Sequence, residues 1–503
     1  MRTLISNGLL LTLDVEEHVL EHGDLLVEDD LIVDISEHGD GSSGRAVDRV
    51  IDASGKLVMP GLVNAHLHSY DVYMKGMYEG LPLEPWMPYL SLGTRRPFTQ
   101  HEIYVRTQRV AAEMLRNGIT TAHDFLKLLP LDRHSLDTVM EAYRDVGIRV
   151  IVGVDMGDRP TSMTMPYLSD ILPPQVRESM DAPPPLPQDE LLDFCQWMIQ
   201  SWDGREGRLH IALDPSAPQR CSDEFLAAVD GLSREFGVPL TTHVLETKVQ
   251  AVTGREFFGK SIVEHLADLQ ILSPRLSVVH GVWLSEHDLE LLAEAETSVV
   301  HNPLSNLRLL SGIAPVPEMG RAGINVALGC DNNNSSDTQN LFGAMRMAAL
   351  LHQVSGPNFG ERKPAREVLR MATAGGARSS LLHDSIGSLE VGKKADIVLL
   401  DLNTYAFSPL NDPVRQLVYS ETGSSVDTVL VNGELVVEGK TLITVNEDAL
   451  LDEVRQIART LPPEHERAHL AADELQPYLQ RMYWRSVKQD VGINRYSRPV
   501  EST

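Results

Sequence analysis

The chain has 503 residues and a formal net charge of −27, from 44 Lys and Arg against 71 Asp and Glu. A negative excess of this size repels phosphate backbones and anionic lipid surfaces, which argues against a nucleic-acid or membrane partner. Polar residues interrupt the N-terminal stretch and no apolar run is long enough to span a bilayer, so we expect a cytoplasmic protein. The three cysteines are too few and too scattered for a thiolate zinc site, so any metal ion would be held by His and carboxylate side chains.

Residues 1–58 consist of short β-rich runs separated by acidic and Gly-containing turns. The same pattern of short β-rich runs recurs in residues 395–400 and 428–437, where Asn432-Gly433 predicts a tight hairpin turn. We therefore expect both ends of the chain, residues 1–58 and 387–445, to form one β-sandwich.

The middle of the chain, residues 59–386, repeats an amphipathic helix, a Gly and a short β-branched strand. In one copy, residues 102–117 predict the helix, Gly118 suits a left-handed cap, and residues 119–123 predict the strand. Counting all copies together with the other apolar runs yields eight strands, the number that closes a (β/α)8 TIM-like barrel. The predicted class is therefore α/β.

Two segments depart from this repeat. Residues 158–207 form a long connection that is either a lid or pocket wall, or a peripheral addition. Residues 446–503 predict a helical tail that serves as a subunit contact or as an arm packed on the barrel. We expect a homodimer or a higher homo-oligomer.

Metal-ligating residue types stand at the predicted C-terminal ends of nearly all eight strands. Because parallel barrel strands end on one face, these side chains converge there, although they are far apart in sequence. The two histidines one residue apart share one side of their strand, since strand side chains repeat every two residues. We predict a metal site from this set, which in chain order is His66 with His68, His123, Asp155, Asp214, His243, His280, His301 and Asp331.

An ordered set of motifs from residue 1 to about residue 440 resembles the amidohydrolase superfamily, in its branch of cytosine-deaminase-like, adenosylhomocysteine-deaminase-like and triazine-hydrolase-like enzymes. The residues that carry the resemblance are Pro60-Gly61-Leu62-Val63-Asn64-Ala65-His66-Leu67-His68, Leu81-Pro82-Leu83 with Trp86, His243-Val244-Leu245-Glu246, His280-Gly281, His301-Asn302-Pro303, Asp331, and Gly387-Ser388-Leu389-Glu390-Val391-Gly392-Lys393-Lys394-Ala395-Asp396.

The resemblance implies that His66, His68, His243 and Asp331 bind one divalent ion. Neutral imidazole and carboxylate ligands suit Zn²⁺, although Fe²⁺ or another divalent ion fits the same ligands. No Lys ends the fourth strand, where binuclear relatives carry a carboxylated lysine between two metals, so we expect one ion.

The resemblance also implies roles for three catalytic residues. Glu246 is expected to take a proton from the metal-bound water and deliver it to a ring nitrogen as hydroxide attacks the adjacent carbon. His280 is expected to orient that hydroxide, and Asp331 to pass the remaining proton to the leaving amine. The alternative for Glu246 is a solvated acid at a helix start.

Candidate substrate-binding residues are Trp86, Arg95, Ser216, His123 and His301. Trp86 forms the wall of a pocket for a flat ring or packs in the core, and the two histidines line the pocket or are structural. Arg95 and Ser216 stand where adenosine-type deaminases carry an acid and a histidine. We therefore expect poor turnover of adenosine, methylthioadenosine and adenosylhomocysteine, and better turnover of a free base, a triazine or a ring with an anionic substituent near Arg95.

The leading hypothesis is a metal-dependent aminohydrolase that attacks a ring carbon of a nitrogen heterocycle and releases ammonia or an amine. The alternative is a triazine-type hydrolase that releases chloride or an alkylamine, or an amide or urea hydrolase using the same site. A more remote alternative is a non-catalytic barrel scaffold.

Overall fold

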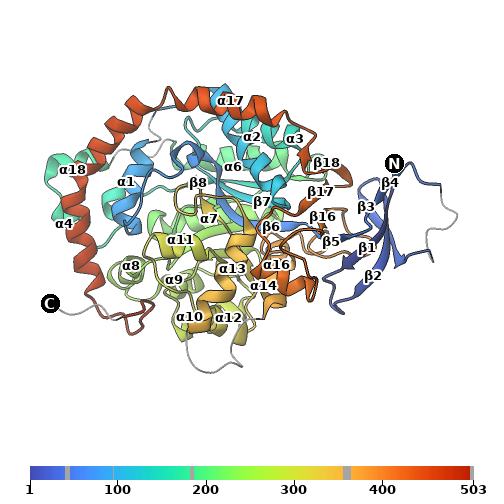
Figure 1. Cartoon of the computed structure of the whole chain (residues 1–503). Coiled ribbons are helices and arrows are strands. Elements are labelled where there is room, and N and C mark those ends of the chain that lie inside the picture. Colours follow the sequence, from blue (N-terminus) through green and yellow to red (C-terminus); the bar gives the residue numbers. More distant parts are fainter. Residues whose placement is uncertain (40–45, 94–95, 182–185, 355–363, 499–503) are drawn as a thin grey trace.

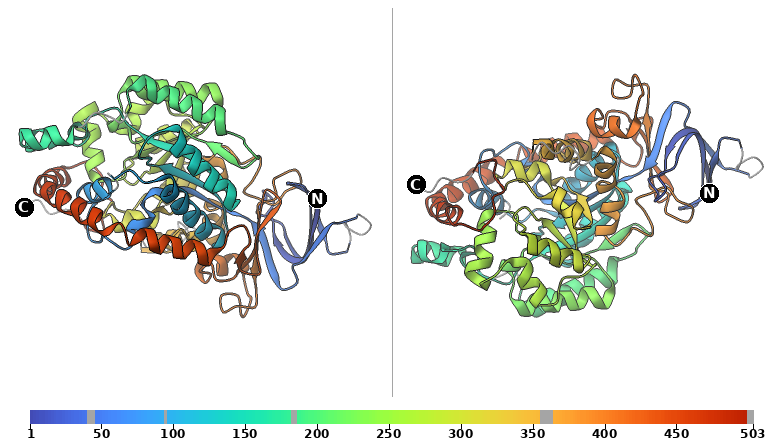
Figure 2. Two further views of the ribbon diagram at one scale, coloured as in Figure 1. Left: turned by 90° about the horizontal axis from the view of Figure 1, so that it is seen from above. Right: turned by 90° about the horizontal axis from the view of Figure 1, so that it is seen from below.

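The computed structural model describes residues 1–39, 46–93, 96–181, 186–354 and 364–498. A helix-covered barrel occupies the centre of the molecule, and a sheet that contains the N-terminal strands stands on one side of it (Figure 1). The last long helix runs along the opposite side of the barrel, as the views from above and below also show (Figure 2). No helix among the described residues is long and apolar enough to cross a bilayer.

The barrel consists of parallel strands in two hydrogen-bonded arcs. One arc has the order β10-β8-β7-β6-β15 with β9 beside β8, and the other has the order β11-β12-β13-β14. A bridge between Leu213 and Leu240 joins the arcs on one side, and pairing of Asp331 with Leu67 brings the last strand back to the first. The strands are β6 (Leu62–His68), β7 (Ile119–Leu126), β8 (Arg149–Met156), β9 (Leu209–Ile211), β10 (Asp214–Pro215), β11 (Leu240–Val244), β12 (Leu276–His280), β13 (Ser298–His301), β14 (Val326–Leu328) and β15 (Asp331–Asn332).

Helices cover the outside of the barrel, as the alternating pattern of the sequence predicts. Gly147 and Gly237 end α3 and α7 in the left-handed conformation, with φ of 90° and 70°, and each leads directly toward a strand. The main barrel helices are α2 (Gln100–Arg116), α3 (Arg133–Val146), α6 (Gln188–Trp202), α7 (Asp223–Phe236), α8 (Lys248–Phe258), α9 (Ile262–Asp268), α10 (Glu286–Glu294), α11 (Pro303–Arg308), α12 (Val316–Arg321), α13 (Leu341–Leu351), α14 (Ala365–Met371) and α15 (Ala374–Ser379).

Both ends of the chain enter one continuous nine-stranded sheet, in the order β19-β18-β17-β16-β5-β1-β2-β3 with β4 against β1. Its central strand β5 pairs parallel with β1 and antiparallel with β16, and thereby joins the N-terminal and C-terminal parts. The sheet has its own core, which includes Ile5, Val58 and Ile397. Its strands are β1 (Arg2–Leu11), β2 (Val19–Glu28), β3 (Leu31–Glu37), β4 (Arg49–Asp52), β5 (Lys56–Pro60), β16 (Ile397–Asp401), β17 (Val426–Val431), β18 (Glu434–Glu438) and β19 (Thr441–Leu442).

The C-terminal tail is helical and packs on the barrel as an arm. After α17 (Glu447–Ala458), the long helix α18 (Pro462–Val487) contacts α1 (Leu83–Gly93), α4 (Leu168–Ile171) and α8. A small apolar cluster beneath it includes Leu168, Val249 and Met482. The long connection 158–207 thus has two parts: α4 packs under the tail, whereas α6 covers β9 of the barrel.

Candidate metal centre and active site

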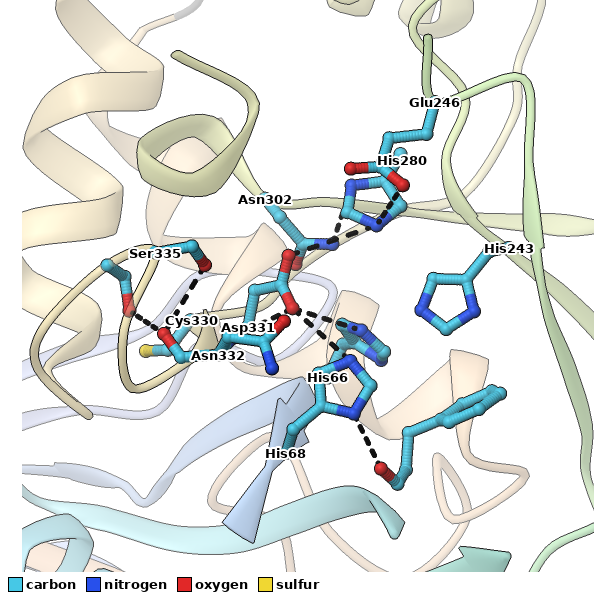
Figure 3. Close-up of polar contacts among 12 residues, drawn as sticks. His66, His68, His243, Glu246, His280, Asn302, Cys330, Asp331, Asn332 and Ser335 are labelled. Carbon is cyan, nitrogen blue, oxygen red and sulfur yellow. Dashed lines mark hydrogen bonds and ion pairs between the residues drawn. The ribbon is translucent and has the colours of Figure 1, made fainter. Parts of the chain in front are cut away.

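Five of the predicted site residues converge at the C-terminal ends of the barrel strands. His66 and His68 end β6, His243 lies on β11, His280 ends β12, and Asp331 begins β15. Ligand atoms of the first three lie within 4.8 Å of one another, and so do those of His66, His280 and Asp331. Figure 3 shows His66, His68, His243 and Asp331 around a common centre, with Glu246 and His280 to one side.

Hydrogen bonds behind the histidines orient their free nitrogens toward this centre. The His68 Nδ1–H donates to the Phe125 carbonyl at 2.6 Å, and the His243 Nδ1–H donates to the Ser216 carbonyl at 2.7 Å. Each bond leaves the Nε2 lone pair available as a metal ligand. Asp331 Oδ1 lies 3.5 Å from His66 Nε2 and 3.4 Å from His68 Nε2.

The protonation states of these groups suit a divalent cation. Burial lowers the pKa of His66 to about 3 and that of His243 well below its usual value, so both imidazoles are neutral. Burial alone would raise the pKa of Asp331, but the nearby imidazoles, that of His66 first, outweigh it and hold that pKa well below its usual value. Neither ring nitrogen of His66 has a hydrogen-bond partner within the described part of the chain. Three imidazole nitrogens and a carboxylate oxygen match the ligand preference of Zn²⁺.

Unusual backbone conformations occur at three residues next to or within the site. Leu245, His280 and Asp331 have positive φ values of 51°, 75° and 64°. Such conformations cost on the order of 1–3 kcal/mol each and persist only where the surrounding packing imposes them. Gly329 permits the chain before Asp331 to approach His66 closely, because a Cβ there would lie 2.3 Å from Asn302 Oδ1 and 2.9 Å from the Cβ of His66.

Glu246 is buried beside the centre, with only 3% of its surface exposed, so it is not a solvated acid at a helix start. Its Oε2 lies 3.6 Å from His280 Nε2, and its Oε1 accepts a hydrogen bond of 3.5 Å from the Ser311 hydroxyl. Burial, reinforced by the charge of Asp331, raises the pKa of Glu246 to about 8. This carboxyl group can therefore carry a proton near neutral pH.

A cavity of 90 Å³ opens above this centre. Its apolar wall includes Tyr70, Leu83, Trp86 and Leu90, so Trp86 lies at the pocket. The polar residues on its wall, besides those around the metal centre, are Ser91, Lys127, Asp155, Ser216, Arg220, Gln250 and Asn332.

The other predicted substrate-binding residues lie in different places. Ser216 reaches the cavity, and its hydroxyl accepts a hydrogen bond of 3.0 Å from Arg220 Nη1. His123 and His301 are buried but are not among the residues that line the cavity. His123 Nε2 lies 3.2 Å from the Asp214 carboxylate, and the His301 ring lies near that of His352. Arg95 lies outside the described residues.

Sequence reasoning missed three charged residues at the cavity. Lys127 directly follows the last residue of β7, and Arg220 ends a short turn after β10, so their positions after strand ends were the available signal. Glu84 lies behind the cavity wall, where its Oε1 accepts a hydrogen bond from the Thr247 hydroxyl. Burial raises the pKa of Glu84 to about 7.

Comparisons with known proteins agree with this geometry. The model of the amidohydrolase family matches residues 57–436. A 5-methylthioadenosine/S-adenosylhomocysteine deaminase from Syntrophobacter fumaroxidans is 34% identical over 460 residues, which are 92% of this chain and 98% of that protein.

Two solved structures share the fold over nearly their whole length. A zinc-bound adenosine deaminase from Xanthomonas campestris has a TM-score of 0.81 at 29% identity, covering 91% of this chain and 98% of the other. A zinc complex of atrazine chlorohydrolase from Arthrobacter aurescens TC1 has a TM-score of 0.82 at 28% identity, covering 91% and 100%.

Proposed function

This chain belongs to the amidohydrolase family as a metal-dependent hydrolase of the deaminase type, and we propose that its substrate is an aromatic nitrogen heterocycle with an exocyclic amino group. An adenine-type ring is the first candidate, because the similar proteins from S. fumaroxidans and X. campestris are deaminases of adenine-containing nucleosides. The observation that carries the proposal is the buried Glu246 carboxyl beside the histidine cluster, because amine release requires a proton donor at that place.

We propose that His66, His68, His243 and Asp331 hold one Zn²⁺ ion. The ligand set and the zinc in two similar structures support this assignment. When bound, the ion supplies a Lewis acid that lowers the pKa of water toward neutrality, as in other hydrolases with neutral imidazole ligands.

Glu246 moves the first proton. Its carboxylate accepts a proton from the attacking water and, as a carboxylic acid, delivers it to the ring nitrogen next to the carbon under attack. The raised pKa of Glu246 matches both tasks, since the group must hold and release a proton near neutral pH. Its Oε1 is placed by the Ser311 hydroxyl, and its backbone N–H donates to Gln250 Oε1 at 2.9 Å.

His280 and Asp331 serve the second half of the reaction. His280 Nδ1 lies 2.8 Å from Asn306 Oδ1, which fixes the ring so that Nε2 faces Glu246 and Asp331. From there the Nε2 lone pair accepts a hydrogen bond from the attacking water and orients it toward the ring. Asp331 accepts the remaining proton of that oxygen and passes it to the leaving amine, which departs as ammonia.

A second candidate is hydrolysis of a triazine-type ring with loss of an alkylamine or chloride. The similarity to atrazine chlorohydrolase supports this class. The buried proton donor Glu246 favours loss of an amine over loss of chloride.

Metal analysis combined with an ammonia-release screen tests the proposal. Protein purified without added metal should contain one equivalent of zinc, and steady-state assays should detect ammonia from at least one ring among purines, pyrimidines, pterins and triazines. Adenine, adenosine and methylthioadenosine in the screen separate a free-base enzyme from a nucleoside enzyme. Two metal equivalents, with activity proportional to the second, would contradict the single-ion site, and chloride release without any ammonia or amine release would contradict the deaminase.

A further inference from the structure

Arg220 places a guanidinium group in the wall of the active-site cavity. It ends the short turn Pro218–Arg220 that follows β10, and it borders the same cavity as His243, Glu246 and Asp331. Its Nη1 donates to the Ser216 hydroxyl at 3.0 Å, and its Nη2 lies 3.2 Å from the Met87 sulfur, which is a weak acceptor. A guanidinium group has five N–H donors, and the described residues accept side-chain hydrogen bonds from two of its nitrogens, so donor capacity is left for another partner.

No carboxylate compensates this charge at close range. Within the described residues, Arg220 has no ion pair at 4.0 Å or less, whereas Arg149 is bonded to Asp396 at 2.7 Å and Arg275 to Asp230 at 2.7 Å. Glu84 and Glu246 are near enough for Arg220 to lower their pKa values, yet burial keeps those values at about 7 and about 8. Neither carboxyl group lies within ion-pair distance of Arg220, so the geometry leaves its guanidinium available to a ligand in the cavity.

We propose that Arg220 is a specificity-determining residue that binds an anionic substituent of the substrate, such as a carboxylate, while the ring amine faces Glu246. The proposal rests on the deaminase function proposed above and assigns the substrate class within it. Arg95, the cation that the sequence predicts near such a substituent, lies outside the described residues.

The chemistry of the guanidinium fits this role. Its planar fork pairs with both oxygens of a carboxylate or with a phosphate, and such charge-assisted bonds are stronger than bonds between neutral groups. The hydroxyl of Ser216 anchors one edge of the fork, and the backbone carbonyl of the same residue accepts the hydrogen bond from the metal ligand His243. Ser216 thus fixes the position of the anion site relative to the metal centre.

The test compares two anionic substituents with a neutral one that has the shape of the carboxylate. Once the screen has identified a productive ring, three derivatives are compared on the full-length zinc enzyme: one with a carboxymethyl group, one with the isosteric neutral carboxamide, and one with a phosphonomethyl group. Wild-type enzyme should show a kcat/KM roughly tenfold or more higher for an anionic derivative than for the carboxamide. Preference for either anion supports the proposal, and their order identifies the anion as carboxylate-like or phosphate-like.

Two variants assign the preference to Arg220. Arg220→Gln should reduce the ratio of kcat/KM for the anion over the carboxamide to near one, and Arg220→Lys should retain part of it, because Lys keeps the charge and loses the fork. Arg415→Gln removes a charge from a side chain that is 76% exposed and should leave the ratio unchanged.

Other outcomes separate the possible failures. If Arg220→Gln lowers both kcat/KM values equally, Arg220 acts on Glu246 and not on the substrate, and the inference is wrong. If no ring in the screen is turned over, the proposed function fails. Calorimetric binding of the carboxymethyl derivative of adenine and of its neutral carboxamide then still tests the anion site. Equal affinity of the wild-type protein for the two derivatives would overturn the anion site. Tighter binding of the carboxylate that Arg220→Gln abolishes would support it.

If Arg220→Gln does not fold, Ser216→Ala takes its place, with the same expected direction and a smaller change.

Discussion

At the scale of single residues, burial decides which acids of the active site hold a proton. Glu84 is 3% exposed, and within the described residues its Oε2 has no hydrogen-bond partner. Burial, reinforced by Glu246, raises its pKa from 4.5 in the unfolded chain to about 7, although the bond from Thr247 opposes the shift. The contribution of protonated Glu84 to the stability of the folded protein is therefore fully present below about pH 4.5 and is lost as the pH rises through 7.

Glu84→Gln removes this titration. Because the folded pKa is raised, the variant should gain stability relative to wild type between pH 4.5 and 7, reaching on the order of 3 kcal/mol above pH 8. Urea unfolding at pH 4.5 and pH 8, at the same metal content, measures the difference. Glu224→Gln changes an exposed glutamate on α7 and serves as the control. A difference that is independent of pH would show that Glu84 is ionised throughout.

Glu246 and His243 should separate proton transfer from metal binding. Glu246→Gln keeps the size of the side chain and should lower kcat by roughly a hundredfold or more while the metal stays bound, which is the usual scale for losing a general acid–base group. His243→Ala removes a ligand and should lose metal and activity together. Metal analysis and steady-state kinetics of both variants check this, and full activity of the Gln variant would remove Glu246 from the mechanism.

At the scale of elements, the C-terminal helix α18 holds two helices that flank the active site. The Gln476 side chain donates to the Pro85 carbonyl of α1 at 2.7 Å, next to Trp86. Lys248 Nζ, in the first turn of α8 after Glu246, donates to the Val487 carbonyl at 2.7 Å. The arm therefore supports the cavity wall as well as the fold.

Met482→Ala tests the packing of this arm. Met482 is fully buried against the cluster that includes Leu168 and Val249, so the substitution should cost about 2–5 kcal/mol of unfolding free energy. It should also raise KM, because α1 loses support. Leu470→Ala, on the same helix but 59% exposed, should change unfolding by less than about 0.5 kcal/mol. Thermal unfolding and kinetics of the two variants should differ accordingly, and equal effects would contradict a packed arm.

At the scale of the whole molecule, one buried ion pair joins the barrel to the end sheet. Arg149 at the start of β8 bonds both carboxylate oxygens of Asp396, at 2.7 and 2.9 Å. The same carboxylate accepts the Asn432 N–H at 2.7 Å, and the Asp396 carbonyl accepts the Gly61 N–H at 2.9 Å. Asp396, which belongs to a motif that carries the family resemblance, thus has a structural role far from the metal.

Asp396→Asn leaves the buried guanidinium of Arg149 without its countercharge, which should cost about 3–5 kcal/mol. Lys440→Gln breaks a pair of 3.9 Å between partly exposed side chains on the same sheet and should cost no more than about 1 kcal/mol. Chemical unfolding measures both. If the two variants lose equal stability, the Arg149–Asp396 pair stabilises the contact between the barrel and the end sheet no more than an exposed pair does.

The sequence by itself determined the alternation of helices and strands and the clustering of His66, His68, His243, His280 and Asp331. The helix period and caps such as Gly147 are local signals, because backbone conformation there depends on neighbouring residues. The placement of His66, His243 and Asp331 at strand ends was sufficient to predict that they meet, since parallel barrel strands end on one face.

Only the tertiary structure decided which other side chains reach the cavity. His123 and His301 also stand at or near strand ends, yet His123 lies against Asp214 and His301 near His352, away from the cavity wall. Arg220 reaches the cavity because a short turn after β10 redirects the chain. Strand position fixes where a Cα lies, but the direction of a side chain and the burial that shifts its pKa depend on distant segments that close around it. Such contacts between segments far apart in the chain leave no local pattern in the sequence.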